Sequence, residues 1–330
     1  MPTPLVDEVA RHLAARASWR PLEYAFWLAA LASVFVFPGR HLILTEIAWL
    51  ALFALSLDLI LGYAGIISLG HAAFFGLGSY AAALFAKYGI INEPVLALVV
   101  SGFIAAVLGF ATSFLVLRGS DLTRLMVTLG VALIMREIAN QIPDLTGGAD
   151  GLQGVRMWKL FGVFQFDLYG TTAYTYSLAV LFVCFLVARR LINSPFGLAL
   201  RGIRENAIRM PAIGAPTRAH IRKVYTIAAV MAGVAGALLA QTTETVSLET
   251  LSFQRSADVL VILILGGAGR LYGGLVGAVI YMVARDQFSG INPQYWYFWI
   301  GTLLVAVVIF LPNGILGGAA RLVRFGRSRA

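Results

Sequence analysis

Five ionisable residues lie within long apolar stretches of this sequence: Glu46, Asp58, Arg136, Glu137 and Asp258. If these stretches cross a bilayer, each charge costs roughly 2.5–3.5 kcal/mol at the membrane centre on insertion scales. Such side chains therefore face the protein interior or a watery cavity, where they contact a polar solute or pair with one another. Their chemistry would be recognition of a polar solute within a membrane.

A polar stripe is predicted on one face of the segment 122–142. Thr128, Arg136 and Asn140 are separated by multiples of four residues, which places them together on a helix. Arg136 could meet a solute carboxylate there, or it could pair with an acid on a neighbouring helix; both interpretations are open. His71 follows Gly70 in a glycine-broken stretch, where a packing hydrogen bond is a commoner role than titration.

Motifs of enzymatic chemistry are absent from the sequence. It has no phosphate-binding Gly-x-x-x-x-Gly-Lys-Ser/Thr, no His-Glu-x-x-His and no nucleophile elbow. Its four histidines are far apart, and Cys184 is the single cysteine. No catalytic residue, metal site or cofactor is therefore predicted, and energy for any driven transport must come from elsewhere.

The composition indicates an all-α polytopic membrane protein. Of 330 residues, 59% are hydrophobic and 12% charged, and the mean hydropathy is +0.83. A soluble domain needs more surface charge, and the apolar runs are continuous rather than alternating as in a spanning β-barrel. The net charge of +9 does not indicate nucleic-acid binding, because the basic residues are not interleaved with aromatic ones on one surface.

About 20 apolar residues are needed for one helical crossing, and the sequence predicts ten crossings. The eighth and ninth are short, so eight crossings plus a re-entrant pair around a glycine-rich turn is the alternative. The predicted crossings are 22–38, 42–61, 65–86, 95–117, 122–142, 173–188, 224–241, 256–266, 273–285 and 295–311.

Charge placement predicts the orientation. Residues 189–223 carry eight Lys/Arg and one acid, Glu205, and both termini are also basic, whereas residues 143–172 carry three aspartates against Arg156 and Lys159. By the positive-inside rule, both termini and the 189–223 loop are cytoplasmic and the 143–172 loop is extracytoplasmic. We expect one domain over residues 1–330, with the bundle at 22–311, in a bacterial inner membrane.

The 189–223 loop contains a helix-compatible stretch, 198–210, that is broken at Pro211. A stiff helix displayed in the cytoplasm could receive a push from a partner ATPase. The alternative is a solvated basic connector that only fixes the topology.

Four segments together resemble the M-type membrane subunit of the branched-chain amino acid ABC importers (LivH/LivM type), and with their spacing they cover about three-quarters of the chain. Residues 61–80, Leu-Gly-Tyr-Ala-Gly-Ile-Ile-Ser-Leu-Gly-His-Ala-Ala-Phe-Phe-Gly-Leu-Gly-Ser-Tyr, are similar to the family's third helix. Residues 145–152 resemble its external loop, 197–214 its coupling loop and 265–278 its glycine turn.

The resemblance implies an ABC importer permease bundle. The implied partners are a homologous second permease, two cytoplasmic ATP-binding subunits and an extracytoplasmic solute-binding protein, in contact with membrane lipid. The expected substrate path is lined by Asp58, Ser68, His71, Phe74, Thr128, Arg136 and Glu137. The expected ATPase-coupling residues are Arg201, Arg204, Glu205, Asn206 and Gly214.

Four positions depart from the family pattern. Asp58 stands where asparagine is usual and Ile66 where glutamine is common, while Ala207 and Pro211 replace acids of the coupling loop. The first pair leaves the solute open among branched-chain amino acids, urea, amides and aromatic or other carboxylates. A stand-alone channel or secondary carrier is the alternative of another class.

Overall fold

A computed structural model describes residues 19–118, 121–167, 169–311 and 313–318. These residues form twelve α-helices, short 3-10 and π turns and two isolated β-bridges, and no β-strand. The α-helices are α2 (Pro21–Val36), α3 (His41–Asp58), α4 (Ala72–Lys87), α5 (Pro94–Val116), α6 (Asp121–Gln141), α7 (Pro143–Thr146), α8 (Thr171–Ile192), α9 (Pro195–Asn206), α10 (Thr217–Thr243), α11 (Phe253–Gly266), α12 (Gly273–Ile291) and α13 (Trp296–Phe310).

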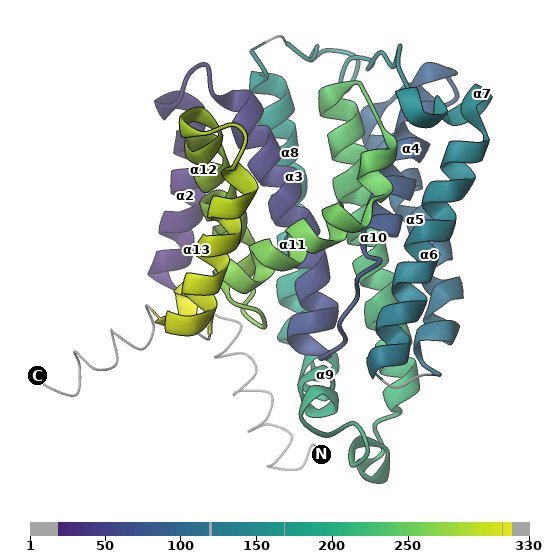
Figure 1. The fold of residues 1–330 in the computed structure, drawn as a ribbon, viewed down its shortest axis with the longest axis vertical. Coiled ribbons are helices and arrows are strands. Elements are labelled where there is room, and N and C mark those ends of the chain that lie inside the picture. Colours follow the sequence, from purple (N-terminus) through teal and green to yellow (C-terminus); the bar gives the residue numbers. More distant parts are fainter. Residues whose placement is uncertain (1–18, 119–120, 168, 312, 319–330) are drawn as a thin grey trace, which may run out of the picture.

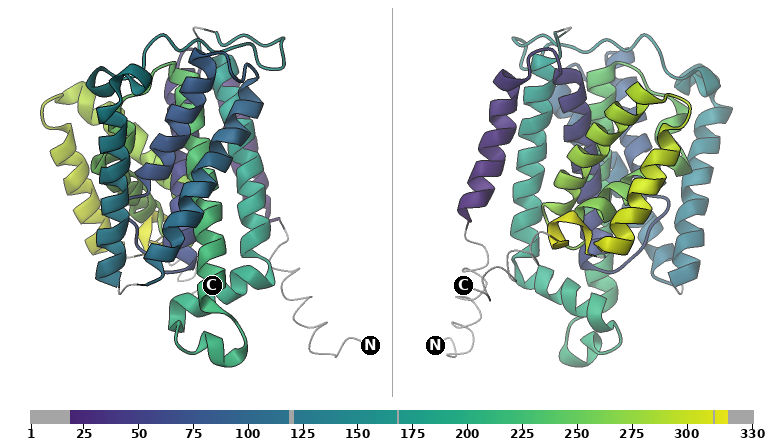
Figure 2. Two further views of the ribbon diagram at one scale, coloured as in Figure 1. Left: turned by 90° about the vertical axis from the view of Figure 1, so that its right-hand side faces the viewer. Right: turned by 60° about the vertical axis from the view of Figure 1, so that its left-hand side comes forward.

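The long helices run alternately up and down between two ends of a bundle (Figure 1). We call these the α9 end and the α7 end after the short helices that lie there. The helix α2 begins and α13 finishes at the α9 end, and the connector between α6 and α8 covers the α7 end (Figures 1 and 2).

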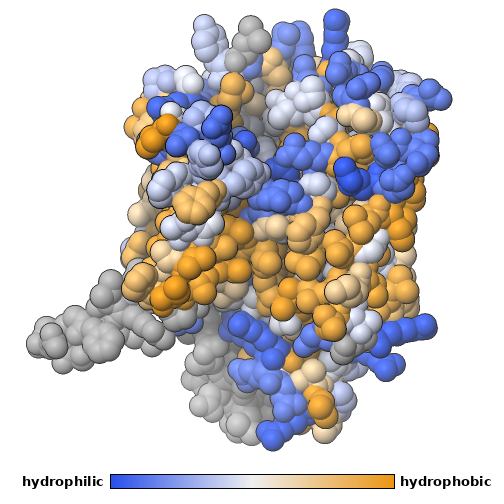
Figure 3. Space-filling view, viewed as in Figure 1, coloured by the Kyte–Doolittle hydropathy of each residue, from blue (hydrophilic) through white to orange (hydrophobic). Residues whose placement is uncertain are grey.

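Five helical segments among the described residues are long and apolar enough to cross a membrane. They are His41–Tyr63, Pro94–Val116, Thr171–Ile192, Thr217–Thr243 and Trp296–Gly318. On the face seen in Figure 3, apolar side chains form a broad belt across the bundle, with hydrophilic residues above and below it. The chain is a multi-pass membrane protein. The prediction of ten crossings is met only in part, because the other helices are shorter or less apolar.

The helix α10 lies at the centre and packs against α3, α4 and α5. Small residues allow this close packing: a Cβ added at Gly236 would lie 1.8 Å from the Phe75 carbonyl oxygen, and one at Gly78 would lie 2.1 Å from that of Gly233. Main chains of neighbouring helices therefore touch directly, which is the usual use of small residues in membrane bundles.

The predicted crossing 65–86 is not one continuous helix. The helix α3 passes into a π turn at Leu59–Tyr63, and residues 64–71 then run back into the bundle without helical structure before α4 begins at Ala72. A Cβ at Gly70 would lie 1.8 Å from the Thr128 carbonyl oxygen, so this segment lies directly against α6. Irregular backbone at membrane depth persists only when protein buries it, and Ile66 and Ser68 are both buried.

The helix α11 has 14 residues, which is too short to cross a membrane, and it meets the similarly short α4 inside the bundle. The Ala72 amide donates a hydrogen bond to the Ser256 hydroxyl at 3.0 Å, so the N-terminal turns of the two helices are in contact. After α11, a turn leads into α12, which ends at Ile291 rather than at the predicted residue 285.

The connector predicted at 189–223 is shorter than expected. The helix α8 continues to Ile192 and α10 begins at Thr217, which leaves 193–216 as the connector. Its helix, α9, covers 195–206 rather than 198–210, because the Ser194 hydroxyl accepts the Gly197 amide and Pro195 occupies the first turn. At its other end, the Asn206 side chain accepts the amides of Ile208 and Arg209.

Candidate solute cavity and coupling contact

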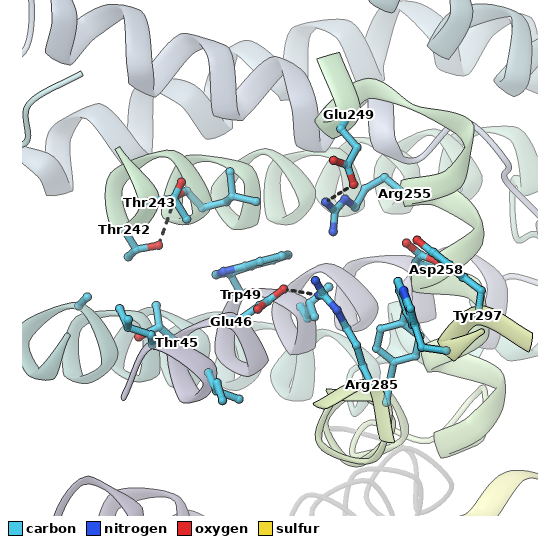
Figure 4. A pocket seen from close by; sticks show the side chains of 17 residues that line it. Thr45, Glu46, Trp49, Thr242, Thr243, Glu249, Arg255, Asp258, Arg285 and Tyr297 are labelled. Carbon is cyan, nitrogen blue, oxygen red and sulfur yellow. Dashed lines mark hydrogen bonds and ion pairs between the residues drawn. The ribbon is translucent and has the colours of Figure 1, made fainter. Parts of the chain in front are cut away.

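A cavity of about 680 Å³ lies between α3, α10, α11, α12 and α13 (Figure 4). Ionisable residues from four parts of the chain line it: Glu46 of α3, Glu249 from the turn before α11, Arg255 and Asp258 of α11, and Arg285 of α12. On this face of the molecule, hydrophilic surface reaches down between α13 and α10 into the apolar belt (Figure 3). The volume is in the range of small-molecule sites.

Two ion pairs line the cavity. The Arg285 Nη1 lies 2.7 Å from Glu46 Oε1, which joins α12 to α3, and the Arg255 Nη2 lies 3.3 Å from Glu249 Oε1. The side chains of Glu46 and Arg285 are 29% and 38% exposed, so this pair is reachable from the cavity. Asp258 accepts a hydrogen bond from the Gln254 amide at 3.1 Å.

Aromatic rings hold the two guanidinium groups. The Arg255 Cζ lies 5.8 Å from the ring centroid of Trp49, and the Arg285 Cζ lies 5.6 Å from that of Trp296. At these distances the ring faces attract the cations, and they also present apolar surface. The cavity therefore combines fixed charges of both signs with apolar walls, which suits a small solute that carries an ammonium, a carboxylate and an apolar side chain.

A separate cluster at the α9 end joins α9 to two glycine turns. The buried Asp58 carboxylate accepts the Gly269 amide at 2.7 Å, which ties the end of α3 to the turn between α11 and α12. The Arg204 guanidinium donates to the Gly62 carbonyl oxygen in the π turn. A Cβ at Gly62 would lie 2.4 Å from the Gly269 nitrogen, so the two turns pack backbone against backbone.

Of the other residues predicted for coupling, Arg201 also contacts the π turn. The Arg201 Cζ stacks 5.5 Å from the Tyr63 ring centroid. Glu205 and Asn206 are exposed. Gly214 has a φ of +85°, a left-handed conformation that favours glycine, at the end of the connector before α10. Through Arg201 and Arg204, α9 is thus fixed to the π turn at the end of α3.

Comparison with known sequences assigns the family. The family described as branched-chain amino acid transport system / permease component matches residues 40–308. The chain belongs to this family. No solved structure matches.

Individual relatives in the family carry transport names. The high-affinity branched-chain amino acid transport system permease protein LivM of Escherichia coli (strain K12) is 30% identical over 283 residues, which cover 79% of this chain and 66% of that protein. The LivM of Salmonella typhimurium is 31% identical over 285 residues, with the same coverage. The LivH permease protein of S. typhimurium is 26% identical over 285 residues, 81% of this chain and 91% of the relative. The chain thus spans just under two thirds of the LivM proteins' length.

Most of the residues predicted to line the substrate path are buried among other side chains and lie outside the cavity. Asp58, Ser68, His71, Phe74 and Thr128 are buried, and none of them lines the cavity. A ring nitrogen of His71 shares a 2.8 Å hydrogen bond with the Ser56 hydroxyl, and its ring stacks on Phe53, which agrees with the packing interpretation. The Thr128 hydroxyl accepts the Leu69 amide at 3.3 Å.

Arg136 and Glu137 are exposed in the last two turns of α6. Glu137 accepts a hydrogen bond from the Gln141 amide at 2.6 Å. Among the described residues, Arg136 has no ion pair with a neighbouring helix.

Sequence reasoning did not predict three ionisable residues of the cavity, namely Glu249, Arg255 and Arg285. Glu249 and Arg255 precede the predicted crossing 256–266, and Arg285 is the last residue of the predicted crossing 273–285, so all three resemble charges at membrane boundaries. The signal that could have found them is the clustering of charges around two short apolar segments, because a half-length helix starts inside the membrane.

Proposed function

We propose that this chain is a transmembrane permease subunit of an ATP-driven ABC importer for branched-chain amino acids or a similar small zwitterion. The observation that supports it most directly is the cavity lined by two Arg–Glu pairs and aromatic rings in a member of this permease family. An amino acid presents one carboxylate and one ammonium, and the cavity offers partners for both. The relatives' names add transport of branched-chain amino acids.

The half-length helix α11 supports the placement of the carboxylate. Helices that begin within the membrane direct the positive end of their dipole at anionic groups of transported solutes. The first turn of α11 carries Arg255, which lines the cavity. We infer that the solute carboxylate approaches Arg255 or Arg285 and that the ammonium approaches Glu46, Asp258 or Glu249.

The contact between α9 and the glycine turns supports a route for coupling. A push on α9 reaches the π turn of α3 through Arg204 and Gly62, and the Asp58–Gly269 bond passes it to the turn between α11 and α12. The helices α3, α11 and α12 carry Glu46, Asp258 and Arg285 into the cavity. Motion of α9 would therefore change the spacing of the cavity charges.

The proposal includes a homologous second permease, two cytoplasmic ATP-binding subunits that hydrolyse ATP, and an extracytoplasmic solute-binding protein. It places the α9 end in the cytoplasm of a bacterium and the 143–172 loop outside the inner membrane, in one permease domain over residues 1–330. Both termini, which lie outside the described residues, are proposed to be cytoplasmic as well. Clustering of basic residues on α9 and the adjoining ends of α8 and α10 supports this orientation. Urea, amides or aromatic carboxylates are the alternative cargo.

Substitution of the cavity charges in the importer reconstituted with its partners tests the path. Arg285→Gln should lower uptake of radiolabelled leucine about 10- to 150-fold, because a hydrogen bond to a charged group is worth about 1.5–3 kcal/mol. Glu46→Gln/Arg285→Gln removes both charges without leaving one unpaired and should remain defective. Normal uptake by this double variant would mean that the pair is structural and that solute passes elsewhere.

Arg136→Gln is the matched control, because it removes an exposed cation that does not line the cavity. It should leave uptake nearly unchanged. A selective loss of carboxylate-bearing solutes in this variant would instead favour the path predicted along α6. Uptake by vesicles that hold this chain alone, without ATPases, would indicate a channel or secondary carrier.

A further inference from the structure

A second cavity of about 830 Å³ forms a groove between α5, α8 and α10. It lies toward the α9 end, because its lining includes the last turn of α8, the first turns of α10, and Phe196 of α9 (Figure 2, left). Its walls are apolar, with Phe110, Leu191 and Ile227 among them. None of its lining residues was considered in the solute path.

Three cations line this groove and no carboxylate does. They are Arg190 at the end of α8 and Arg222 and Lys223 near the start of α10. The guanidinium of Arg222 is fixed in place: its Cζ lies 4.4 Å from the ring centroid of Phe114 and 6.0 Å from that of Phe110. The Arg222 Nε is buried and has no hydrogen-bond partner among the described residues.

We propose that this groove binds an anionic phospholipid, with the headgroup phosphate against Arg190, Arg222 and Lys223 and an acyl chain along the apolar walls. Basic pockets between transmembrane helices bind such headgroups because each cation near the surface contributes to phosphate attraction. A free phosphate ion would match the cations but leave the apolar walls without a partner. A zwitterionic lipid would fill the walls, but its own cation offsets its phosphate, so it adds no net negative charge against the three cations. Charge and shape together therefore favour the anionic lipid.

The position of the groove gives the lipid a structural consequence. Ser194, which caps α9, and Phe196 in its first turn both line the groove. A bound lipid would thus hold the base of α9 against α8 and α10. This binding does not depend on which solute is transported.

Lipid binding can be measured on the purified, delipidated full chain in detergent by native mass spectrometry during titration with phosphatidylglycerol. Each cation near a membrane surface contributes about 1 kcal/mol, which corresponds to about a fivefold change in affinity. Arg190→Gln/Lys223→Gln should therefore weaken phosphatidylglycerol binding about 25-fold. Phosphatidylcholine should bind weakly, and equally to the native chain and the variant.

The matched control is Arg209→Gln/Arg218→Gln, which removes two exposed cations at the same end that do not line the groove. It should retain the affinity of the native chain. Equal phosphatidylglycerol affinity in the native chain and the groove variant would overturn the proposal, as would an equal loss in the control. Displacement of the lipid by millimolar inorganic phosphate would identify a free-anion site. Loss of lipid only when a partner subunit is added would identify a protein interface. Either result would also refute the lipid proposal. Equal thermal unfolding of all forms without lipid checks that they are folded.

Discussion

Replacement of Gly62 by alanine should separate the two glycine turns that connect α9 with the solute cavity. The new Cβ would lie 1.9 Å from the Asp58 Oδ1 and 2.4 Å from the Gly269 nitrogen. Moving either neighbour costs free energy, because the Gly269 nitrogen is backbone and the Asp58 side chain is a buried carboxylate that accepts the Gly269 amide. The carboxylate must therefore leave its hydrogen bond, or the turns must move apart.

The cost follows from the two contacts that the methyl group disrupts. Loss of a hydrogen bond to a charged group costs about 1.5–3 kcal/mol, and insertion of a methyl group into packed protein costs about 1–3 kcal/mol. Together they give a loss of roughly 2.5–6 kcal/mol if the turns stay together. Since this is a large part of a domain's stability, we expect the turns to separate and the contact to be lost.

The assay is solute uptake and ATP hydrolysis by the complete importer in proteoliposomes. Gly62→Ala should lower the amount of solute transported per ATP at least tenfold, while basal hydrolysis by the partner ATPases persists. Gly130→Ala is the control, because no atom lies within 4 Å of its added Cβ and alanine favours a helix. An unchanged ratio of transport to hydrolysis in Gly62→Ala, together with unchanged thermal stability, would refute the role of this contact.

Two further predictions concern stability, measured by thermal unfolding in detergent. Gly236→Ala should destabilise the chain by about 1–3 kcal/mol, because its Cβ would lie 1.8 Å from the Phe75 carbonyl oxygen. Gly290→Ala should not destabilise it, because no atom lies within 4 Å of the added Cβ. Equal unfolding temperatures of the two variants would contradict the packing of α10 on α4. Burial alone would raise the pKa of Asp167, but the amides of Thr172 and Thr171 outweigh it and hold the pKa below its ordinary value. The ionised carboxylate therefore stabilises the start of α8 above about pH 4 and loses this effect as the pH falls further. The difference between the native chain and Asp167→Asn, about 0.3–1 kcal/mol for a negative charge near a helix N-terminus at neutral pH, should shrink below that pH.

The sequence predicted the existence of every long helix among the described residues, because apolar runs in a membrane favour helices, but it also placed residues 65–71 in a helix where the structure has irregular backbone. Boundaries were wrong where polar residues continue a helix beyond the apolar run. The helix α10 begins at Thr217 rather than at 224, since residues 217–223 are helical although several of them are polar. Hydropathy detects the membrane-embedded part of such a helix and misses its extension.

The candidate site was less predictable. Glu46 and Asp258 stood out as charges within apolar runs, and the structure brings both to the cavity. Arg285, which pairs with Glu46, is 239 residues further along the chain, and nothing in the spacing of the chain indicates that pair. Pairing of this kind depends on which helices become neighbours, which hydropathy and periodicity do not encode.

The irregular segment 64–71 also constrains how the protein is made. Its main-chain groups cannot remain in lipid, and their partners arrive late: the Leu69 amide needs Thr128, and the Ala72 amide needs Ser256, 184 residues further along the chain. When α4 has been synthesised, the residues that bind these amides in the folded protein have therefore not yet been synthesised. We therefore expect truncations that remove the last third of the chain, and with it Ser256 and α11, to be degraded rather than to accumulate as smaller stable bundles.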